Sequence, residues 1–281
     1  MEAWKIGDVE IRRVVDVVQP FPATGLIPQA TPDALTDLHD WLCPHFADTQ
    51  GNLQLSIHAF AVRSGDARIV VDTCLGNKPR PLGMPELQST FLEDLEGIGF
   101  APAAVDRVLC THLHFDHIGW NTILEDGRWV PTFPNARYLV GEAEWGYWKD
   151  EDDPYAPEAK VDSVLPIFEA DLVDLVEPTH VVTDEIRLIP TPGHTPGHVS
   201  VLIESRGEQA IITGDLFHSP LQMAHPDWTD SADVDGALAF ETRQKFLESY
   251  ADGPVLILGT HFASPTAGHI VRDGDSFRFA I

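Results

Sequence analysis

The chain has 281 residues, of which 43 % are hydrophobic and 22 % are charged, so it is long enough to bury one large core. Asp and Glu number 44 against 18 Lys and Arg, which gives a formal net charge of −26. An acidic chain of this kind repels phosphate backbones and anionic lipid headgroups. The composition therefore argues against nucleic acids and membranes as partners.

The first residues show no targeting signal, because residues 1–18 alternate charged and apolar side chains instead of placing an apolar block after a basic start. No run of about 18 apolar residues predicts a membrane span. Cys43, Cys74 and Cys110 are odd in number, which favours thiols packed as small hydrophobes. We expect a cytoplasmic protein.

The first predicted strands cover residues 9–18, 53–62 and 68–72, which are rich in β-branched side chains and end at Gly, Pro or Asp clusters. The segment 19–52 between the first two is rich in Pro, Asp and His and is too long for an ordinary connection. We interpret it as an inserted segment that contacts either the substrate pocket or a second copy in a homodimer.

A helix is predicted over residues 85–97, where Leu87, Phe91, Leu92 and Leu95 fall at helical spacing. Further strands are predicted at 107–110, 138–140, 186–189, 199–203, 210–213 and 255–258, helices at 142–149 and 234–250, and a closing hairpin at 270–279. Strands interleaved with helices predict an α/β layered fold. Since the sequence contains no repeat and no linker, we expect a single domain over 1–281.

Four potential metal ligands, His112, His114, Asp116 and His117, follow the strand predicted at 107–110. Residues two apart in an extended chain share a side, so His112 and His114 can converge on one ion. A turn beginning at Asp116 can direct Asp116 and His117 toward a second ion. An isolated His usually packs in the core or lies at the surface, but packing alone does not explain four ligands in so short a loop.

Three further candidates, His194, Asp215 and His261, stand where predicted strands end. Sites in α/β sheets gather at the carboxyl ends of strands. Each candidate has Gly among its near neighbours, which allows the backbone to turn sharply and approach an ion. We therefore expect these three side chains to converge with the 112–117 loop.

This pattern resembles the metallo-β-lactamase superfamily, whose His-x-His-x-Asp-His motif followed by a distant His, an Asp and a final His is matched here at every position. The resemblance covers most of the chain, since the ligands extend from His112 to His261. It implies a four-layer αββα sandwich with the metals at the edges of the sheets. It also implies that His112, His114 and His194 hold one metal, that Asp116, His117 and His261 hold the second, and that Asp215 bridges them.

Two further residues are expected beside the ligands. Asp72 matches an Asp at an early strand end in the family and would orient a ligand, although a simple turn Asp is the alternative. His198 is expected to orient a neighbour rather than to bind metal. Imidazole and carboxylate ligands suit two divalent metal ions, with Zn²⁺ favoured and Mn²⁺, Fe²⁺ or Co²⁺ as alternatives.

The resemblance also indicates a branch of the superfamily. A Cys in place of Asp215 would indicate the zinc β-lactamases, and a Glu in place of His114 the di-iron flavoprotein oxidoreductases; the sequence has neither. Residues 114–121, 133–136 and 214–218 are similar to bacterial lactonases and methyl-parathion-hydrolase-like enzymes. The RNA-cleaving branches share the ligands but need a basic surface.

The predicted function is a dinuclear metal hydrolase in which a metal-bridging hydroxide cleaves an ester bond of a small molecule, with a lactone as the leading substrate class. Asp116 and Asp215 are the candidates to relay the proton. A phosphotriesterase is the first alternative, followed by a thioesterase or a β-lactamase. A metal-binding interaction module without turnover is the alternative outside enzymes.

Substrate contacts are expected from residues near the ligands in sequence. Trp120 and Phe217 could form an apolar wall, and His218 could donate a hydrogen bond to a carbonyl. Trp145 and Trp148 are three residues apart, which is more typical of the buried stripe of a helix than of a substrate wall.

Overall fold

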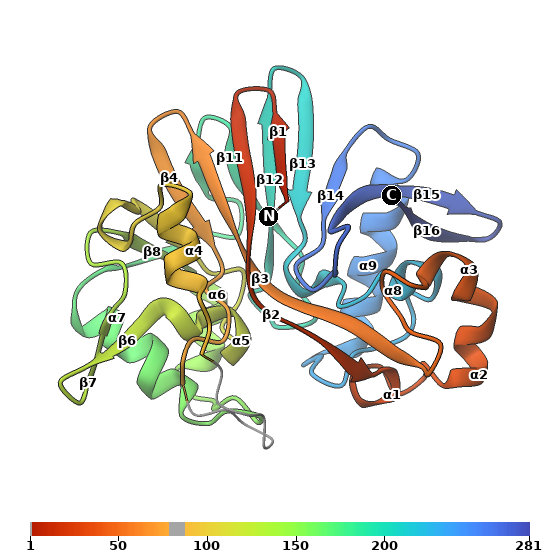
Figure 1. Cartoon of the computed structure of the whole chain (residues 1–281), viewed down its shortest axis with the longest axis horizontal. Helices are drawn as coiled ribbons and strands as arrows, with labels where there is room; N and C mark the ends of the chain where they lie inside the picture. Colours follow the sequence, from red (N-terminus) through yellow and green to blue (C-terminus); the bar gives the residue numbers. More distant parts are fainter. Residues whose placement is uncertain (1, 79–87) are drawn as a thin grey trace.

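The computed structural model describes residues 2–78 and 88–281 (Figure 1). Within these residues, two seven-stranded sheets form the centre of the molecule. Across the first sheet the order is β1 (Ala3–Ile6), β2 (Val9–Pro22), β3 (Asn52–Ser64), β4 (Ala67–Val71), β5 (Arg107–Leu109), β8 (Arg137–Gly141) and β9 (Val173–Val176). Across the second it is β10 (Val181–Thr183), β11 (Ile186–Pro190), β12 (Val199–Ser205), β13 (Glu208–Ile212), β14 (Leu256–Leu258), β15 (Ala267–Asp273) and β16 (Ser276–Ala280).

Helices lie on the outer side of each sheet (Figure 1). The first sheet is covered by α4 (Phe91–Gly97), α5 (Phe115–Ile118), α6 (Glu142–Trp148) and α7 (Leu165–Glu169), beside the small hairpin β6 (Thr122–Glu125) and β7 (Arg128–Pro131). The second is covered by α1 (Ala23–Leu26), α2 (Pro32–Leu35), α3 (His39–Leu42), α8 (Leu221–Ala224) and α9 (Gly236–Tyr250). In the described part of the chain, no helix combines the length and apolar character needed to cross a bilayer.

Alternation along the strands produces the four layers, because successive side chains of a strand point to opposite faces. Ile69 and Val71 of β4 and Leu109 of β5 pack between the two sheets, while Val70 and Val108 pack against the helices. The α/β class and the αββα sandwich are therefore confirmed.

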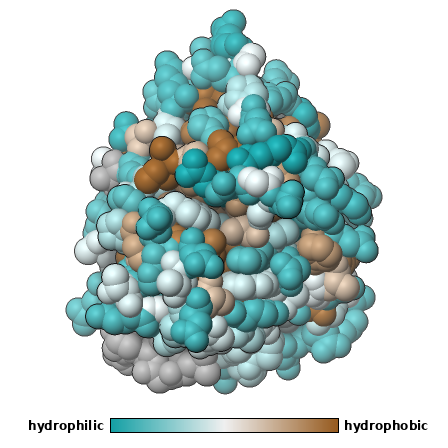
Figure 2. All heavy atoms as spheres, turned by 90° about the vertical axis from the view of Figure 1, so that its right-hand side faces the viewer, coloured by the Kyte–Doolittle hydropathy of each residue, from teal (hydrophilic) through white to brown (hydrophobic). Residues whose placement is uncertain are grey.

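The inserted segment 19–52 is folded onto the second sheet. Its first residues extend β2, and its apolar side chains Ile27, Leu35 and Leu42 are buried in the same core as Phe246 of α9. Figure 2 shows the side of the molecule that is on the right in Figure 1, where α2 and α3 lie. This face is mostly hydrophilic, with small separate hydrophobic groups.

The predicted strands and helices are present, with shifted ends. The helix predicted at 85–97 is α4, which begins at Phe91; Leu87 and residues 85–86 lie outside the described residues. The short strands β1, β6, β7, β9 and β10 were not predicted. They contain between three and four residues each, too few to show a clear alternation.

Candidate metal centre

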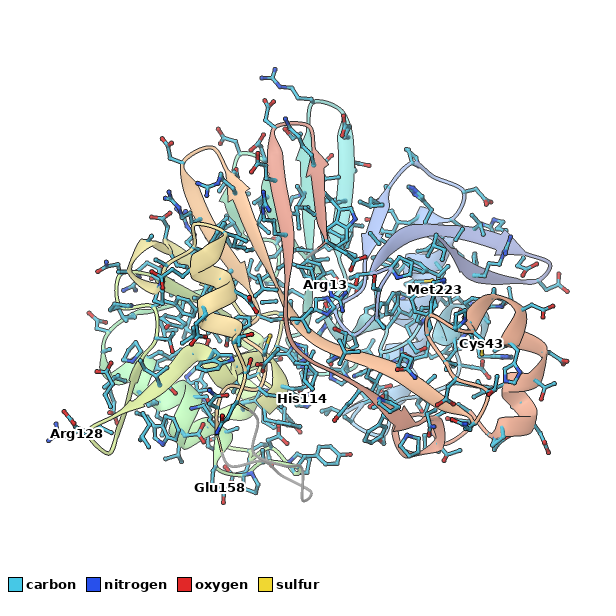
Figure 3. All side chains as sticks on the ribbon, viewed as in Figure 1. Arg13, Cys43, His114, Arg128, Glu158 and Met223 are labelled. Atoms are coloured by element: carbon cyan, nitrogen blue, oxygen red, sulfur yellow. The ribbon has the colours of Figure 1, made fainter. Side chains whose placement is uncertain are left out.

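The seven predicted ligands meet at one edge of the two sheets. His112 and His114 follow β5, and α5 begins one residue later and carries Asp116 and His117. The remaining three follow strands of the second sheet: His194 after β11, Asp215 after β13 and His261 after β14. The site therefore depends on the two sheets facing each other. Figure 3 shows His114 at the junction between the two halves of the molecule.

His112, His114 and His194 form one group of buried potential ligands. His114 Nδ1 lies 3.1 Å from His112 Nε2 and 2.9 Å from His194 Nε2. Burial lowers the pKa of His112 and of His194 well below the ordinary value, which favours neutral rings. Three neutral imidazole nitrogens that converge in this way form a donor set that suits a divalent cation. A cation between them would be coordinated by all three.

Asp116, His117 and His261 form a second group. His117 Nε2 lies 3.8 Å from Asp116 Oδ1, and His261 Nε2 lies 3.6 Å from Asp116 Oδ2. The His117 Nε2 atom is buried and makes no hydrogen bond of regular geometry with the described residues, although the Asp215 carboxylate lies 3.2 Å away. A buried polar atom without a partner costs free energy, and a bound cation would remove that cost.

Asp215 lies between the two groups. Its Oδ2 is 3.6 Å from His112 Nε2, 3.4 Å from His194 Nε2 and 3.2 Å from His117 Nε2. Its Oδ1 is 3.2 Å from His261 Nε2. Burial by itself raises the pKa of this carboxyl, but the nearby imidazoles, His117 and His261 foremost, bring it well below its ordinary value. An ionised carboxylate in this position can face two cations at once, and the donor set as a whole fits divalent metals such as zinc.

Asp72 reaches the second group from the end of β4. Its carboxylate accepts hydrogen bonds from the Thr111 backbone N–H and hydroxyl, each at 2.8 Å. Its Oδ2 also lies 2.9 Å from His117 Nδ1. This contact leaves His117 Nε2 directed at Asp215, which is the arrangement expected if Asp72 orients a predicted ligand.

His198 contacts the backbone of the central carboxylate. Its Nε2 accepts a hydrogen bond of 2.8 Å from the Asp215 N–H, and its Nδ1 lies 3.0 Å from the Thr191 carbonyl oxygen. Burial lowers the pKa of His198 to about 4, which is consistent with a neutral ring that accepts at Nε2 and donates at Nδ1. The ring therefore supports Asp215 and has no nitrogen left for a metal.

Glu144 was missed by the sequence analysis. Its buried carboxylate accepts hydrogen bonds from Leu113 N–H at 2.9 Å, Trp148 Nε1 at 2.7 Å, Thr195 Oγ1 at 2.7 Å and Gly197 N–H at 3.0 Å. Burial raises its pKa, and these four hydrogen bonds oppose that rise. The side chain joins the loop of His112 and His114 to the loop of His194. A single Glu in a predicted helix gives no sequence signal for this role.

A cavity of about 270 Å³ opens beside the ligands His114, Asp116, His194, Asp215 and His261. Its other walls are Val17, Gln19, Phe21, Gly25, Leu26, Leu55, Ile57, Phe115, Tyr155, His218, Asp230, Ser231 and Ala232. The inserted segment 19–52 supplies four of these residues, so it contacts the pocket.

Trp120 and Phe217, two of the predicted substrate contacts, do not line this cavity. Trp120 is buried away from the cavity, where it stacks on Phe91 and its Nε1 donates to Asp16 Oδ1 at 3.3 Å. Phe217 is buried against Phe246 of α9. Phe217 has extended backbone angles, so consecutive side chains point to opposite sides, and His218 is the one that lines the cavity.

The aromatic residues of α6 also pack inside the protein. Trp145 stacks on Phe168, and Trp148 packs edge-on against His114 with 5.2 Å between ring centroids. As the spacing indicated, they belong to the helix core, and neither lines the cavity beside the ligands.

Comparison with known proteins identifies the family. The model of the metallo-beta-lactamase superfamily matches residues 53–276, and the chain belongs to this superfamily. An N-acyl homoserine lactonase of Bacillus cereus is 28 % identical over 181 residues, which is 56 % of this chain and 62 % of the lactonase. Metallo-beta-lactamase domain-containing protein 1 of Xenopus laevis is 28 % identical over 189 residues, 66 % of this chain and 65 % of that protein. The chain thus spans less than two thirds of the length of these relatives.

Solved structures match over nearly the whole chain. The hydrolase AbOPH of the beta lactamase superfamily superposes with a TM-score of 0.79 at 28 % identity, covering 99 % of this chain and 96 % of its own. AidC, a dizinc quorum-quenching lactonase solved with a product, gives a TM-score of 0.81 over the same shares at 22 % identity. At 22 % identity, the similarity to AidC shows that the two proteins share a fold.

Proposed function

We propose that this chain is a metal-dependent hydrolase that cleaves the ester bond of a neutral lactone. The observation that carries the proposal is the position of Asp215 between two three-residue ligand groups, at the wall of an apolar cavity. In this proposal His112, His114 and His194 would hold one ion, Asp116, His117 and His261 would hold the other, and Asp215 would face both. Two divalent ions, with zinc favoured, would supply an activated water and polarise the carbonyl under attack when bound.

The charge of the cavity favours a neutral substrate. Among the described residues that line it, none is Lys or Arg, whereas Asp116, Asp215 and Asp230 are acidic. The whole chain is also strongly acidic, with a formal net charge of −26. Apart from the proposed ions and His218, the described residues of the cavity walls thus offer no cation to pair with a substrate carboxylate or phosphate, such as the carboxylate of a β-lactam antibiotic.

The shape of the cavity suits an apolar group attached to the ester. Val17, Phe21, Leu26, Leu55 and Ile57 line one side of it and come from β2, α1 and β3. The ligands and His218 line the rest. An acyl chain or alkyl group therefore fits against the apolar wall while its ester faces the ligands.

His218 is placed to hydrogen-bond to the substrate. Its Nε2 lies 3.0 Å from Asp215 Oδ2, and its Nδ1 lies 3.4 Å from Asp230 Oδ2. Burial alone lowers the pKa of His218, but Asp230 and Asp215 raise it to about 9. A protonated ring has two N–H groups, which face Asp215 and Asp230 in this structure. In this proposal the Nε2–H would turn to the ester oxygen when the Asp215 carboxylate is engaged by the ions.

Asp116 is the better placed of the two proposed proton carriers. Its side chain is 18 % exposed, compared with 2 % for Asp215. Asp116 lines the cavity and can pass a proton toward solvent. Asp215 is enclosed by imidazoles, and its main proposed role is to bridge the two ions.

A phosphotriester is the second candidate substrate, because it is also neutral and the same cavity accommodates it. A panel of lactones, aryl esters, phosphotriesters, thioesters and a β-lactam, offered to zinc- and manganese-loaded protein, separates the candidates. We expect lactones to give the highest kcat/KM and chelated protein to give none. If metal-loaded protein hydrolyses none of these substrates, a metal-binding module without turnover is favoured. Full activity after chelation would overturn the proposal.

Replacing His218 by alanine tests the proposed hydrogen bond to the substrate. We expect kcat/KM for the best lactone to fall about 10²-fold, as for the loss of one oxyanion donor. Metal content should stay at the wild-type value, since His218 is outside the proposed ligand set. His269→Ala, at an exposed position of β15, is the control and should leave kcat/KM unchanged. Unchanged turnover of His218→Ala would rule out this role.

Phe21→Ala tests the apolar wall. Loss of the ring removes about 1.4 kcal/mol of apolar contact for a substrate that reaches it, which is about a tenfold rise in KM. We expect this rise for a lactone with a six-carbon acyl chain and little change for an unsubstituted lactone ring. An equal effect on both substrates would show that Phe21 supports the fold of the pocket and not the acyl group.

A further inference from the structure

Arg243 of α9 is a fully buried cation that the function proposed above does not use. Its Nε donates to the Leu216 carbonyl oxygen at 2.8 Å, and its Nη1 donates to the Trp228 carbonyl oxygen at 3.2 Å. Its Nη2 lies 3.1 and 2.9 Å from the two carboxylate oxygens of Asp233. A buried charge is tolerated only when it is paired and hydrogen-bonded, because its removal from water costs free energy. We therefore looked for a role of Arg243 that offsets this desolvation cost.

Asp233 connects this cation to a proposed metal ligand. Its Oδ1 lies 3.0 Å from His194 Nδ1, and its Oδ2 accepts a hydrogen bond of 2.9 Å from the Asp230 N–H. An Nδ1–H donated to Asp233 leaves the lone pair of His194 Nε2 directed at the ligand group. The side chain of Asp233 is 1 % exposed, so water does not compete for this contact.

The backbone reinforces the connection. The Val234 N–H donates to the His194 carbonyl oxygen at 2.9 Å, and the Asp235 N–H donates to the Gly193 carbonyl oxygen at 3.0 Å. Gly193 has a φ of +136° and lies so close to α9 that a Cβ there would be 2.3 Å from the Ala239 nitrogen. The His194 loop is thus packed directly against the start of α9.

We propose that Asp233, just before α9, and Arg243 of α9 are positioning residues that together form an anchor for the proposed metal centre. Asp233 fixes the tautomer and orientation of His194, and Arg243 fixes Asp233. The bond from Arg243 to Leu216 holds the residue next to Asp215, so one guanidinium secures the loops of two proposed ligands. The inference rests on the ligand set of the proposed function. It predicts an effect on metal binding that is independent of which substrate is cleaved.

The test measures zinc affinity by competition with a chromophoric chelator, and the absorption spectrum of the Co²⁺-substituted protein. Carboxylates that orient a metal-binding His contribute about 10- to 100-fold to metal affinity. We expect Asp233→Ala and Arg243→Met to weaken zinc binding by this factor and to alter the Co²⁺ bands. Asp233→Asn keeps an oxygen facing His194 Nδ1 and should recover part of the affinity.

Two further variants separate positioning from general stability. The double variant Asp233→Asn with Arg243→Met removes both charges together, so no buried charge is left unpaired, and it should fold with weakened zinc binding. Tyr138→Phe removes a buried hydroxyl that bonds to the Asn121 carbonyl oxygen at 3.0 Å, on the opposite sheet. It should lower the melting temperature without changing zinc affinity or the Co²⁺ spectrum.

If the double variant binds zinc with an affinity within twofold of wild type and has an unchanged Co²⁺ absorption spectrum, the proposal of an anchor is wrong. The proposed function would not be affected by that result. A loss of zinc affinity in Tyr138→Phe equal to that in Arg243→Met would also overturn the anchor, because the effect would then follow from stability. Wild-type protein that binds no metal would overturn the proposed metal centre and the anchor together.

Discussion

Asp215→Ala is expected to abolish lactone hydrolysis and to reduce the amount of bound metal. The Asp215 carboxylate lies within 3.6 Å of the Nε2 atoms of five histidines. Its removal takes away the one anionic group shared by both ligand groups. We expect kcat/KM to fall by at least about 10³-fold, which corresponds to about 4 kcal/mol of transition-state stabilisation. Elemental analysis and steady-state kinetics on the same sample measure both effects.

Two controls accompany this variant. Asp227→Ala removes an exposed aspartate and should retain both metal and activity. Asp215→Asn keeps the size of the side chain but not its charge, and should still lose most of the activity, because the charge is what balances two cations. Wild-type turnover by an Asp215→Ala protein that contains no metal would disprove the proposed chemistry.

Glu144→Ala is expected to cause the largest loss of folding stability. Four buried donors lose their acceptor, and each abandoned donor costs about 1–3 kcal/mol. Because neighbouring costs are not additive, we expect the free energy of unfolding to fall by about 3–5 kcal/mol. This is a large part of the 5–15 kcal/mol that is typical of a folded domain. Urea unfolding of the chelated protein measures it.

The same experiment includes a graded series. In Glu144→Gln the amide oxygen still accepts, but the amide nitrogen then faces the Gly197 N–H, so two donors oppose each other. We expect a loss of about 1–2 kcal/mol. Glu142→Gln, an exposed position on the same helix, should change the stability by less than about 0.5 kcal/mol. Equal stability of Glu144→Ala and wild type would show that water replaces the carboxylate.

The convergence of the candidate metal ligands could be predicted from the sequence because chemistry restricts their residue types. His112, His114, Asp116 and His117 lie within six consecutive residues, and strand ends with nearby glycines marked His194, Asp215 and His261. The α/β layers could be predicted for a related reason. Strands such as β4 and β12 are long enough for their apolar content to show in the local sequence.

The substrate contacts could not be predicted in this way, because proximity in sequence does not fix the direction of a side chain. Phe217 and His218 are neighbours, yet the first is in the core and the second lines the cavity. Trp120 lies near the ligands in sequence, but it stacks on Phe91. Only the packing of helix against sheet decides between these directions.

The sequence by itself determined which chemical groups are available to bind metal and that strands and helices alternate. Tertiary structure decided which apolar side chains face the potential metal ligands across the cavity, and which hydrogen bonds hold those ligands in place. Phe21 and Leu55 line the cavity from β2 and β3. Glu144, Asp233 and Arg243 form hydrogen bonds with residues that are 53, 39 and 27 positions away in the sequence, respectively. Hydrogen bonds between distant segments form only after the two sheets face each other, so no local pattern records them.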